Sequence, residues 1–192
     1  MIKSPSPNQE PRPQGTVIDM LVIHYTGMQT GRAALERMCD PEAKVSAHYM
    51  IEEDGRLFQL VPEEARAWHA GVSYWRGNRD INSRSIGIEL VNPGHEFGYR
   101  PFPEAQMAAL IALAQGILGR HAIPARNVVG HADVAPTRKQ DPGELFDWQR
   151  LAEAGVGQWP GPARELAALA EYGYDISDGS AVLMAYDRHF KG

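Results

Sequence analysis

SIGIELV, residues 85–91, is the clearest strand in this chain of 192 residues. A short, nearly continuous apolar run of this kind is typical of a strand buried inside a sheet. VIDMLVIHY, residues 17–25, is a second run with β-branched residues, and residues 127–129 form a third. Residues 31–38 and 103–121 have the composition or apolar spacing of helices. The sequence therefore predicts an α/β fold in which a mixed central β-sheet is flanked by helices.

Turn signals organise the rest of the chain. Residues 48–51 and 57–61 bracket Asp54-Gly55, which favours a β-hairpin. Residues 1–15 are rich in Pro and polar side chains, and we expect a flexible arm there. WPGP, residues 159–162, ends a main domain that spans 16–158. Residues 159–192 are expected to form a short helical appendage that packs back on this domain, since short segments rarely fold alone.

Composition argues against several classes of protein. The formal net charge of -5 speaks against a nucleic acid partner, because phosphate binding needs a concentrated basic face. No stretch approaches the roughly 18 apolar residues of a membrane span. The N-terminus lacks the apolar segment of a signal peptide, and the single cysteine, Cys39, cannot form an intramolecular disulfide. We expect a cytoplasmic protein, or one of the periplasm or cell envelope if an export signal has been removed, and we expect a monomer.

The segment HADVAPTRKQDPG, residues 131–143, points to metal chemistry. Its Pro and Gly residues predict a rigid loop rather than a helix, which can bring His131 and Asp141 to one ion. A catalytic zinc commonly takes three protein ligands and keeps the fourth position for water. His24, at the end of strand 17–25, is the proposed third ligand; the alternative is a core histidine with both nitrogens hydrogen-bonded. Among the other histidines, His189 is expected at the surface.

Two further residues suit hydrolysis. Glu89 is an acid in a strand that should be largely buried, so it needs a partner or a function. It could act as the general base toward a water on the metal, whereas the alternative is an ion pair with Arg84 or Arg79. Lys139 could stabilise a developing oxyanion, or it could be solvated, as loop lysines usually are.

Aromatic and polar residues suggest a surface for substrate. Trp68 and Asn78 belong, with Tyr74 and Trp75, to a cluster of the kind that stacks on sugars and hydrogen-bonds peptides. A loop packed on the core would use similar residues. Tyr49 could donate a hydrogen bond at the same site, and His69 is a candidate substrate contact.

Four segments together resemble the zinc-dependent N-acetylmuramoyl-L-alanine amidases, a family that shares its fold with the peptidoglycan-recognition proteins. They are VIHYTG (22–27), SAHYMIEEDGRLFQLVPEEARAWHAGVSYWRG (46–77), NSRSIGIELVNPG (82–94) and VVGHADVAPTRKQDPGELFDW (128–148). The resemblance implies that Zn²⁺ is held by His24, His131 and Asp141. It also implies that Glu89 is the general base and that Lys139 stabilises the tetrahedral intermediate.

The resemblance implies a substrate as well. Members act on muropeptide or peptidoglycan fragments, and the bond that they hydrolyse joins the lactyl group of N-acetylmuramic acid to L-alanine of the stem peptide. The AWHAG (67–71) and SIGIE (85–89) segments are similar to those of cytoplasmic amidases that recycle 1,6-anhydro-muropeptides. They are also close to those of envelope amidases that act on polymeric peptidoglycan. A non-catalytic peptidoglycan-recognition module is a further alternative, and residues 159–192 resemble part of a peptidoglycan-binding module.

Overall fold

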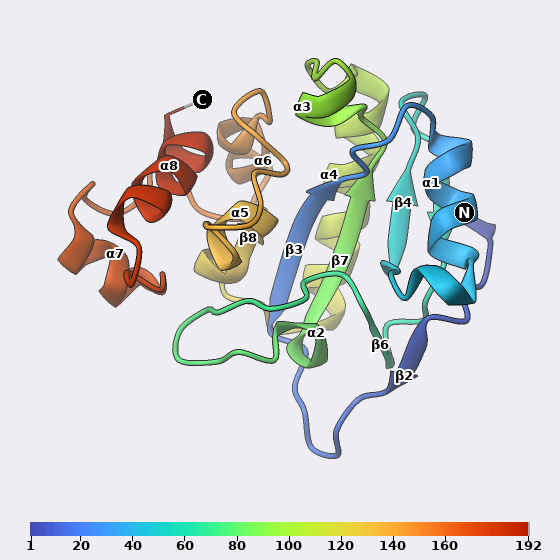
Figure 1. The fold of residues 1–192 in the computed structure, drawn as a ribbon, viewed down its shortest axis with the longest axis horizontal. Coiled ribbons are helices and arrows are strands. Elements are labelled where there is room, and N and C mark those ends of the chain that lie inside the picture. The colour runs from blue at the N-terminus through green and yellow to red at the C-terminus, as the bar shows by residue number, and fades with distance from the viewer. Residues whose placement is uncertain (192) are drawn as a thin grey trace.

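A computed structural model describes residues 1–191 and shows a mixed sheet flanked by helices, as predicted (Figure 1). The strands are β1 (Ile2–Lys3), β2 (Gln9–Pro11), β3 (Met20–Tyr25), β4 (Tyr49–Ile51), β5 (Leu57–Gln59), β6 (Ala65–Ala67), β7 (Ser85–Leu90) and β8 (Val128–Gly130). The α-helices are α1 (Gly31–Cys39), α2 (Ile81–Arg84), α3 (Gly94–Phe97), α4 (Glu104–Arg120), α5 (His131–Val134), α6 (Trp148–Glu153), α7 (Leu166–Tyr172) and α8 (Gly179–Phe190). Short 3-10 helices cover Pro41–Ala43 and Ala125–Asn127.

The strand predicted at 85–91 lies near the centre of the main sheet as β7. The six strands of this sheet have the order β1-β5-β4-β7-β3-β8. β7 is parallel to β3 and β4, and β3 is parallel to β8. The carboxyl ends of β3, β7 and β8 therefore lie together, along the edge of the sheet that runs across the strands. The register places His24 beside Glu89, so both side chains lie on the same face of the sheet near this edge.

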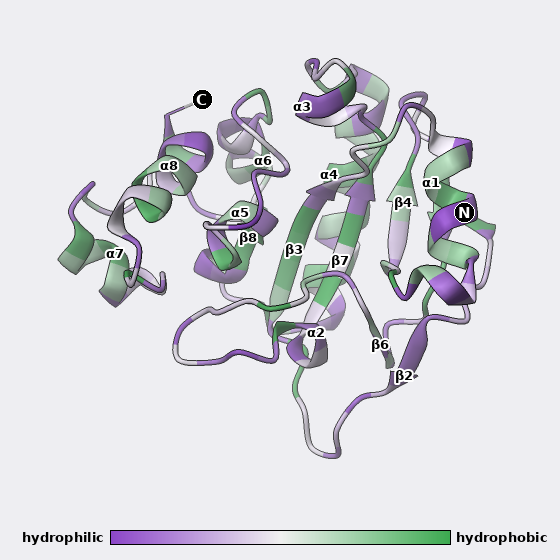
Figure 2. Cartoon of the chain, viewed as in Figure 1, coloured by the Kyte–Doolittle hydropathy of each residue, from purple (hydrophilic) through white to green (hydrophobic). Residues whose placement is uncertain are grey.

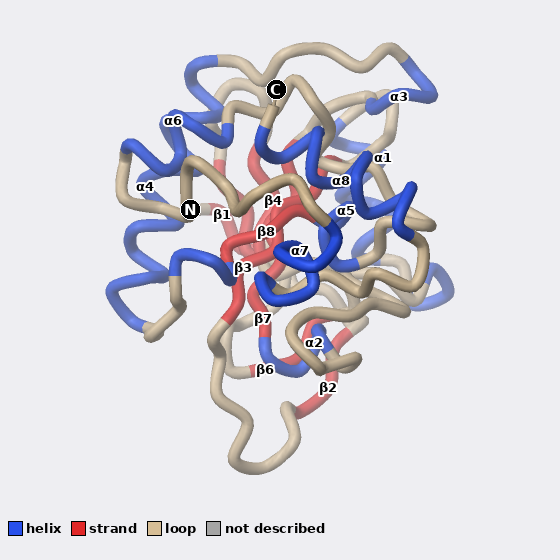
Figure 3. The backbone as a smooth tube through the Cα atoms, turned by 90° about the vertical axis from the view of Figure 1, so that its left-hand side faces the viewer, coloured by secondary structure: helices blue, strands red, loops and turns tan. Residues whose placement is uncertain are grey.

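The two faces of the sheet bury different helices. Ile23 and Ile88 pack on the face that is covered by α4 and α6. Met20 and Val22 point to the opposite face, where they pack with residues of α5, α7 and α8. Figure 2 shows the central strands as largely hydrophobic, and Figure 3 shows α7 and α8 lying over β3 and β8. His24 and Glu89 belong to this second face.

Local signals placed several elements correctly. β4 and β5 form the predicted hairpin, whose turn contains Gly55 at φ 85°. α4 begins after Pro103 and buries its apolar stripe against the sheet. Residues 131–134 differ from the expectation, because they form the helical turn α5 rather than a loop. The Asp133 side chain accepts a hydrogen bond from the Gly130 backbone N–H and so stabilises the first turn.

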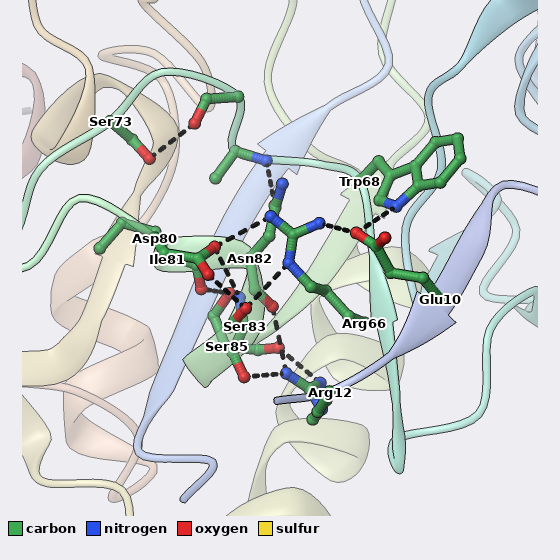
Figure 4. A network of polar contacts seen from close by, with 12 residues as sticks. Glu10, Arg12, Arg66, Trp68, Ser73, Asp80, Ile81, Asn82, Ser83 and Ser85 are labelled. Atoms are coloured by element: carbon green, nitrogen blue, oxygen red, sulfur yellow. Dashed lines mark hydrogen bonds and ion pairs between the residues drawn. The ribbon is translucent and has the colours of Figure 1, made fainter. Parts of the chain in front are cut away.

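Residues 1–15, which we expected to be a flexible arm, are tied to the main domain instead. β1 pairs with β5, and β2 pairs with β6. The Arg12 guanidinium donates hydrogen bonds to the carbonyl oxygens of Asn82, Ser83 and Ser85 (Figure 4) and to that of Glu63. Proline lacks an N–H but is accepted in edge strands, so a Pro-rich composition does not prevent this pairing.

The C-terminal segment packs against the main domain. Leu169, Val182 and Phe190 share one buried cluster with Met20 and Val129 of the sheet. No helix within residues 1–191 combines the length and the apolar character that crossing a bilayer would require.

Candidate active site

The three predicted ligands meet at the carboxyl edge of the sheet. His24 lies near the end of β3, while His131 directly follows β8. Nδ1 of His24 is 3.0 Å from Nδ1 of His131, and Oδ2 of Asp141 is 3.1 Å from each of these nitrogens. All three side chains are buried. The structure thus brings together the three residues that the sequence proposed.

This group has the chemistry of a metal site. Donors bound at about 2.1 Å around a tetrahedral ion lie roughly 3.4 Å apart, which is close to the observed separations. Burial, together with the neighbouring His131, lowers the pKa of His24 to about 4, so its ring is neutral near pH 7, as a ligand must be. Burial alone would raise the pKa of Asp141, but His131 and His24 hold it below its usual value. Two imidazole ligands and one carboxylate leave a fourth position for water.

Glu89 lies beside His24 and has no ion-pair partner within residues 1–191. Its Oε2 atom is buried without a hydrogen bond. The two arginines proposed as partners bind elsewhere, Arg84 to Asp19 and Arg79 to Asp175. Burial raises the pKa of Glu89 well above its usual value, the Asp141 carboxylate raises it further, and Lys139 acts in the opposite direction. A carboxyl group in such surroundings suits proton transfer rather than a structural ion pair.

Lys139 lies at the exposed rim of the site. Its backbone N–H donates to the carbonyl oxygen of Ala135 at 3.0 Å, which fixes the chain just after α5. The side chain is exposed, yet its charge influences the pKa of both Glu89 and His24. An ammonium group in this position can turn toward a bound substrate.

Tyr49 does not reach this site, so the predicted substrate contact is wrong. Its register partner in β7 is Ile88, whereas its neighbour Met50 lies beside Glu89. Because side chains alternate along a strand, Tyr49 points to the opposite face from Glu89. There it is buried in the core with α4, and its hydroxyl donates to Oε1 of Glu63 at 2.7 Å.

Trp68 and Asn78, the other predicted substrate contacts, interact with parts of the chain outside the candidate site. The indole N–H of Trp68 donates to Oε1 of Glu10 at 3.2 Å, which ties this loop to β2 (Figure 4). Asn78 is exposed in a turn with Trp75 and lines a hollow with Asp19. Asp19 precedes β3, so Asn78 lies toward the end of the sheet opposite His24, His131 and Asp141, which contradicts a role in the same site.

His69, which we expected to contact substrate, is enclosed within the fold. The side chain is buried, and both ring nitrogens have partners: Nδ1 lies 3.0 Å from Nε2 of His24, and Nε2 lies 3.0 Å from Oγ of Ser85. Burial lowers the pKa of His69 well below its usual value, and neighbouring histidines add to this. A neutral ring with both nitrogens engaged is not available to substrate.

Sequence reasoning missed a buried carboxylate close to His131, one of the candidate metal ligands. Asp133 Oδ1 accepts a hydrogen bond from the Tyr174 hydroxyl at 2.6 Å, and Oδ2 lies 2.7 Å from Nδ1 of His189. His189, expected at the surface, is therefore buried. The sequence does show an acid two positions after His131. Its buried partners could not be predicted, because Tyr174 and His189 lie far along the chain.

A His/His/Asp group beside a partly buried acid, at the carboxyl ends of parallel strands, defines the site of a candidate hydrolase. The family model described as N-acetylmuramoyl-L-alanine amidase matches residues 14–144, and the chain belongs to this family.

Individual relatives agree with this class. N-acetylmuramoyl-L-alanine amidase AmiD of Escherichia coli is 40% identical in an alignment that covers 91% of this chain and 75% of AmiD. The 1,6-anhydro-N-acetylmuramyl-L-alanine amidase AmpD of Enterobacter cloacae is 37% identical over 164 residues, which cover 77% of this chain and 86% of AmpD. The structure of E. coli AmiD with the substrate anhydro-N-acetylmuramic acid-L-Ala-D-γ-Glu-L-Lys has a TM-score of 0.82 at 40% identity, covering 93% of this chain and 83% of AmiD.

Proposed function

We propose that this protein is a zinc-dependent N-acetylmuramoyl-L-alanine amidase. It hydrolyses the amide bond between the lactyl group of (anhydro-)N-acetylmuramic acid and L-alanine of the stem peptide. The observation that supports this most directly is Glu89, a partly buried acid whose Oε2 atom is buried without a hydrogen bond, beside the group His24, His131 and Asp141 on one face of the sheet. A module that only binds muropeptides has no need of a general base there.

Each of the site residues has a separate role in the proposed hydrolysis. His24, His131 and Asp141 would hold the zinc ion, which when bound supplies polarisation of the scissile carbonyl and activation of water. Glu89 takes a proton from the attacking water and passes it to the departing nitrogen. The amide C–N bond breaks, the water oxygen remains on the lactyl carbon, and L-alanine leaves as an amine. The Lys139 ammonium balances the negative charge that develops on the carbonyl oxygen.

We infer that the substrate is a soluble anhydro-muropeptide handled during peptidoglycan recycling. AmpD is named for the 1,6-anhydro sugar, and the AmiD ligand carries an anhydro sugar with a tripeptide. The cytoplasm is the compartment we propose for this turnover. Cell fractionation with an antibody to the protein tests this, since recovery in the envelope would contradict it.

The central experiment measures products and metal together. Purified protein is incubated with anhydro- and reducing-end muropeptides, the products are identified by mass spectrometry, and bound zinc is measured. We expect release of the stem peptide, loss of activity with a chelator, and its return with zinc. Binding of muropeptides without cleavage would instead support a recognition module.

Glu89→Gln tests the general base in the same assay. We expect kcat/KM to fall by about 10²–10⁴-fold with zinc content unchanged, because proton transfer is lost while the ligands remain. Glu36→Gln, on the exposed face of α1, is the matched control and should retain activity. Unchanged turnover in Glu89→Gln would refute the assigned base.

A further inference from the structure

In both histidine ligands, Nδ1 faces the other ligands and Nε2 faces away from them. The two Nε2 atoms lie within hydrogen-bond distance of His69 and Ala70, which are consecutive residues of one loop. Nε2 of His131 lies 3.0 Å from the Ala70 carbonyl oxygen, and Nε2 of His24 lies 3.0 Å from Nδ1 of His69. A carbonyl oxygen can only accept, so His131 carries its proton on Nε2. Its Nδ1 lone pair is then free to face the metal site.

For His24 the direction of the hydrogen bond is set by Ser85. The Ser85 hydroxyl donates to the carbonyl oxygen of Ile81 at 2.6 Å, so it accepts from Nε2–H of His69 at 3.0 Å. A neutral imidazole protonated at Nε2 has a bare Nδ1. That atom accepts from Nε2–H of His24. The lone pair of His24 Nδ1 consequently points toward His131 and Asp141.

We propose that Ser85 and His69 form a positioning relay that holds His24 in its metal-binding tautomer. The inference rests on the proposed function, because it assigns the relay a role only if a metal binds at His24. His69 is thus a positioning residue and has no contact with substrate. A metal-ligating histidine is usually oriented by a carbonyl or carboxylate at its outer nitrogen; here that place is taken by a second imidazole.

The surroundings hold this imidazole rigidly. The Asn82 side-chain oxygen accepts from the backbone N–H groups of His69 and Ala70 at 3.1 and 2.8 Å. Arg138, from the segment that carries two metal ligands, donates to the Ala70 carbonyl oxygen at 3.1 Å. Gly87 of β7 lies directly against the His69 ring, since a Cβ atom there would be 2.5 Å from Cγ of His69. The ring and the backbone of His69 are therefore both held in place, which a residue must be if it is to set the tautomer of His24.

A matched pair of variants at position 69 separates hydrogen bonding from packing. His69→Leu and His69→Asn have side chains of similar size, but only Asn keeps an acceptor near the position of Nδ1. Zinc affinity is measured by competition with a chromophoric chelator. We expect His69→Leu to bind zinc about 10–100-fold more weakly, and His69→Asn to recover most of that loss.

A second readout needs no metal. Ring ¹⁵N NMR of the metal-free protein should show His24 protonated at Nε2 in wild type and in His69→Asn, and at Nδ1 in His69→Leu. Ser85→Ala, a small change that keeps the fold, frees His69 to take the other tautomer and should weaken zinc binding to an intermediate degree.

The outcomes separate the relay from the proposed function. Equal zinc affinity in wild type, His69→Leu and Ser85→Ala, with the His24 tautomer unchanged, overturns the relay and leaves the zinc site standing. If wild type binds no zinc, the proposed function fails. The relay is then overturned as a metal-positioning device, even where the tautomer shift shows that His69 sets the ring of His24.

Discussion

At the scale of single residues, Glu63 shows how one buried carboxylate joins distant segments. Burial alone would raise its pKa, but hydrogen bonds from Arg120, His121 and Tyr49 lower it to about 2. Because the pKa in the folded state lies below that in the unfolded state, the carboxylate stabilises the fold above about pH 5. This stabilisation is lost as the pH falls toward 2.

Glu63→Gln tests this linkage. We expect the free energy of unfolding to fall by roughly 2 kcal/mol at pH 7, and the difference from wild type to shrink between pH 5 and pH 2. Urea unfolding at several pH values gives both quantities. Glu96→Gln, on the exposed side of α3, should behave like wild type. A difference that does not change with pH would show that charge is not the cause.

The residues that could be predicted are those whose chemistry is local in the sequence. His131 and Asp141 occupy one constrained segment, and Glu89 stands out as an acid in an apolar strand. The surroundings of Tyr49 could not be predicted, because the face on which it lies depends on the register between β4 and β7. The role of His69 likewise depends on partners from two other strands.

At the scale of elements, β7 carries functional positions on alternate residues. Ser85 bonds to the His69 ring, Gly87 leaves room for it, and Glu89 is the proposed base. Ile86 and Ile88, between them, pack into the core on the other face. The period of two in a strand therefore places the relay and the base in one line.

Gly87→Ala tests the close approach of β7 to the ring of His69. The new Cβ would lie 2.5 Å from Cγ of His69, so the ring must move away from Ser85 and His24. We expect the free energy of unfolding to fall by about 1–3 kcal/mol, and zinc binding to weaken. Gly119→Ala in α4 is the control, since its Cβ meets no atom within 4 Å. Equal effects of the two substitutions would contradict this account.

Elements with strong local signals were predictable, whereas those stabilised by distant groups were not. The hairpin at Gly55 and the helix α4 follow from turn chemistry and apolar spacing. α5 was missed because it contains only four residues and depends on its Asp133 cap. β1 and β2 were missed because their partners, β5 and β6, lie about 55 residues further along the chain.

At the scale of the whole molecule, the C-terminal segment and the main domain share both apolar and polar contacts. We propose that residues 159–192 fold as one unit with residues 16–158. Leu169 and Val182 lie in one buried cluster with Met20 of the sheet. Tyr174 also reaches Asp133, two residues after the proposed metal ligand His131. Thermal unfolding of the full chain should therefore show a single transition, and two transitions would indicate an independent module.

Two Tyr→Phe substitutions test whether this segment also supports the metal site. Tyr174→Phe removes the hydrogen bond to Asp133, whereas Tyr186→Phe removes one to the Pro162 carbonyl oxygen, within the C-terminal segment itself. Each should lower the free energy of unfolding by about 1–2 kcal/mol. Only Tyr174→Phe should weaken zinc binding, because Asp133 holds the backbone N–H of Gly130 and so the start of α5 at His131. If both variants bind zinc like wild type, the segment stabilises the fold without positioning the metal ligand.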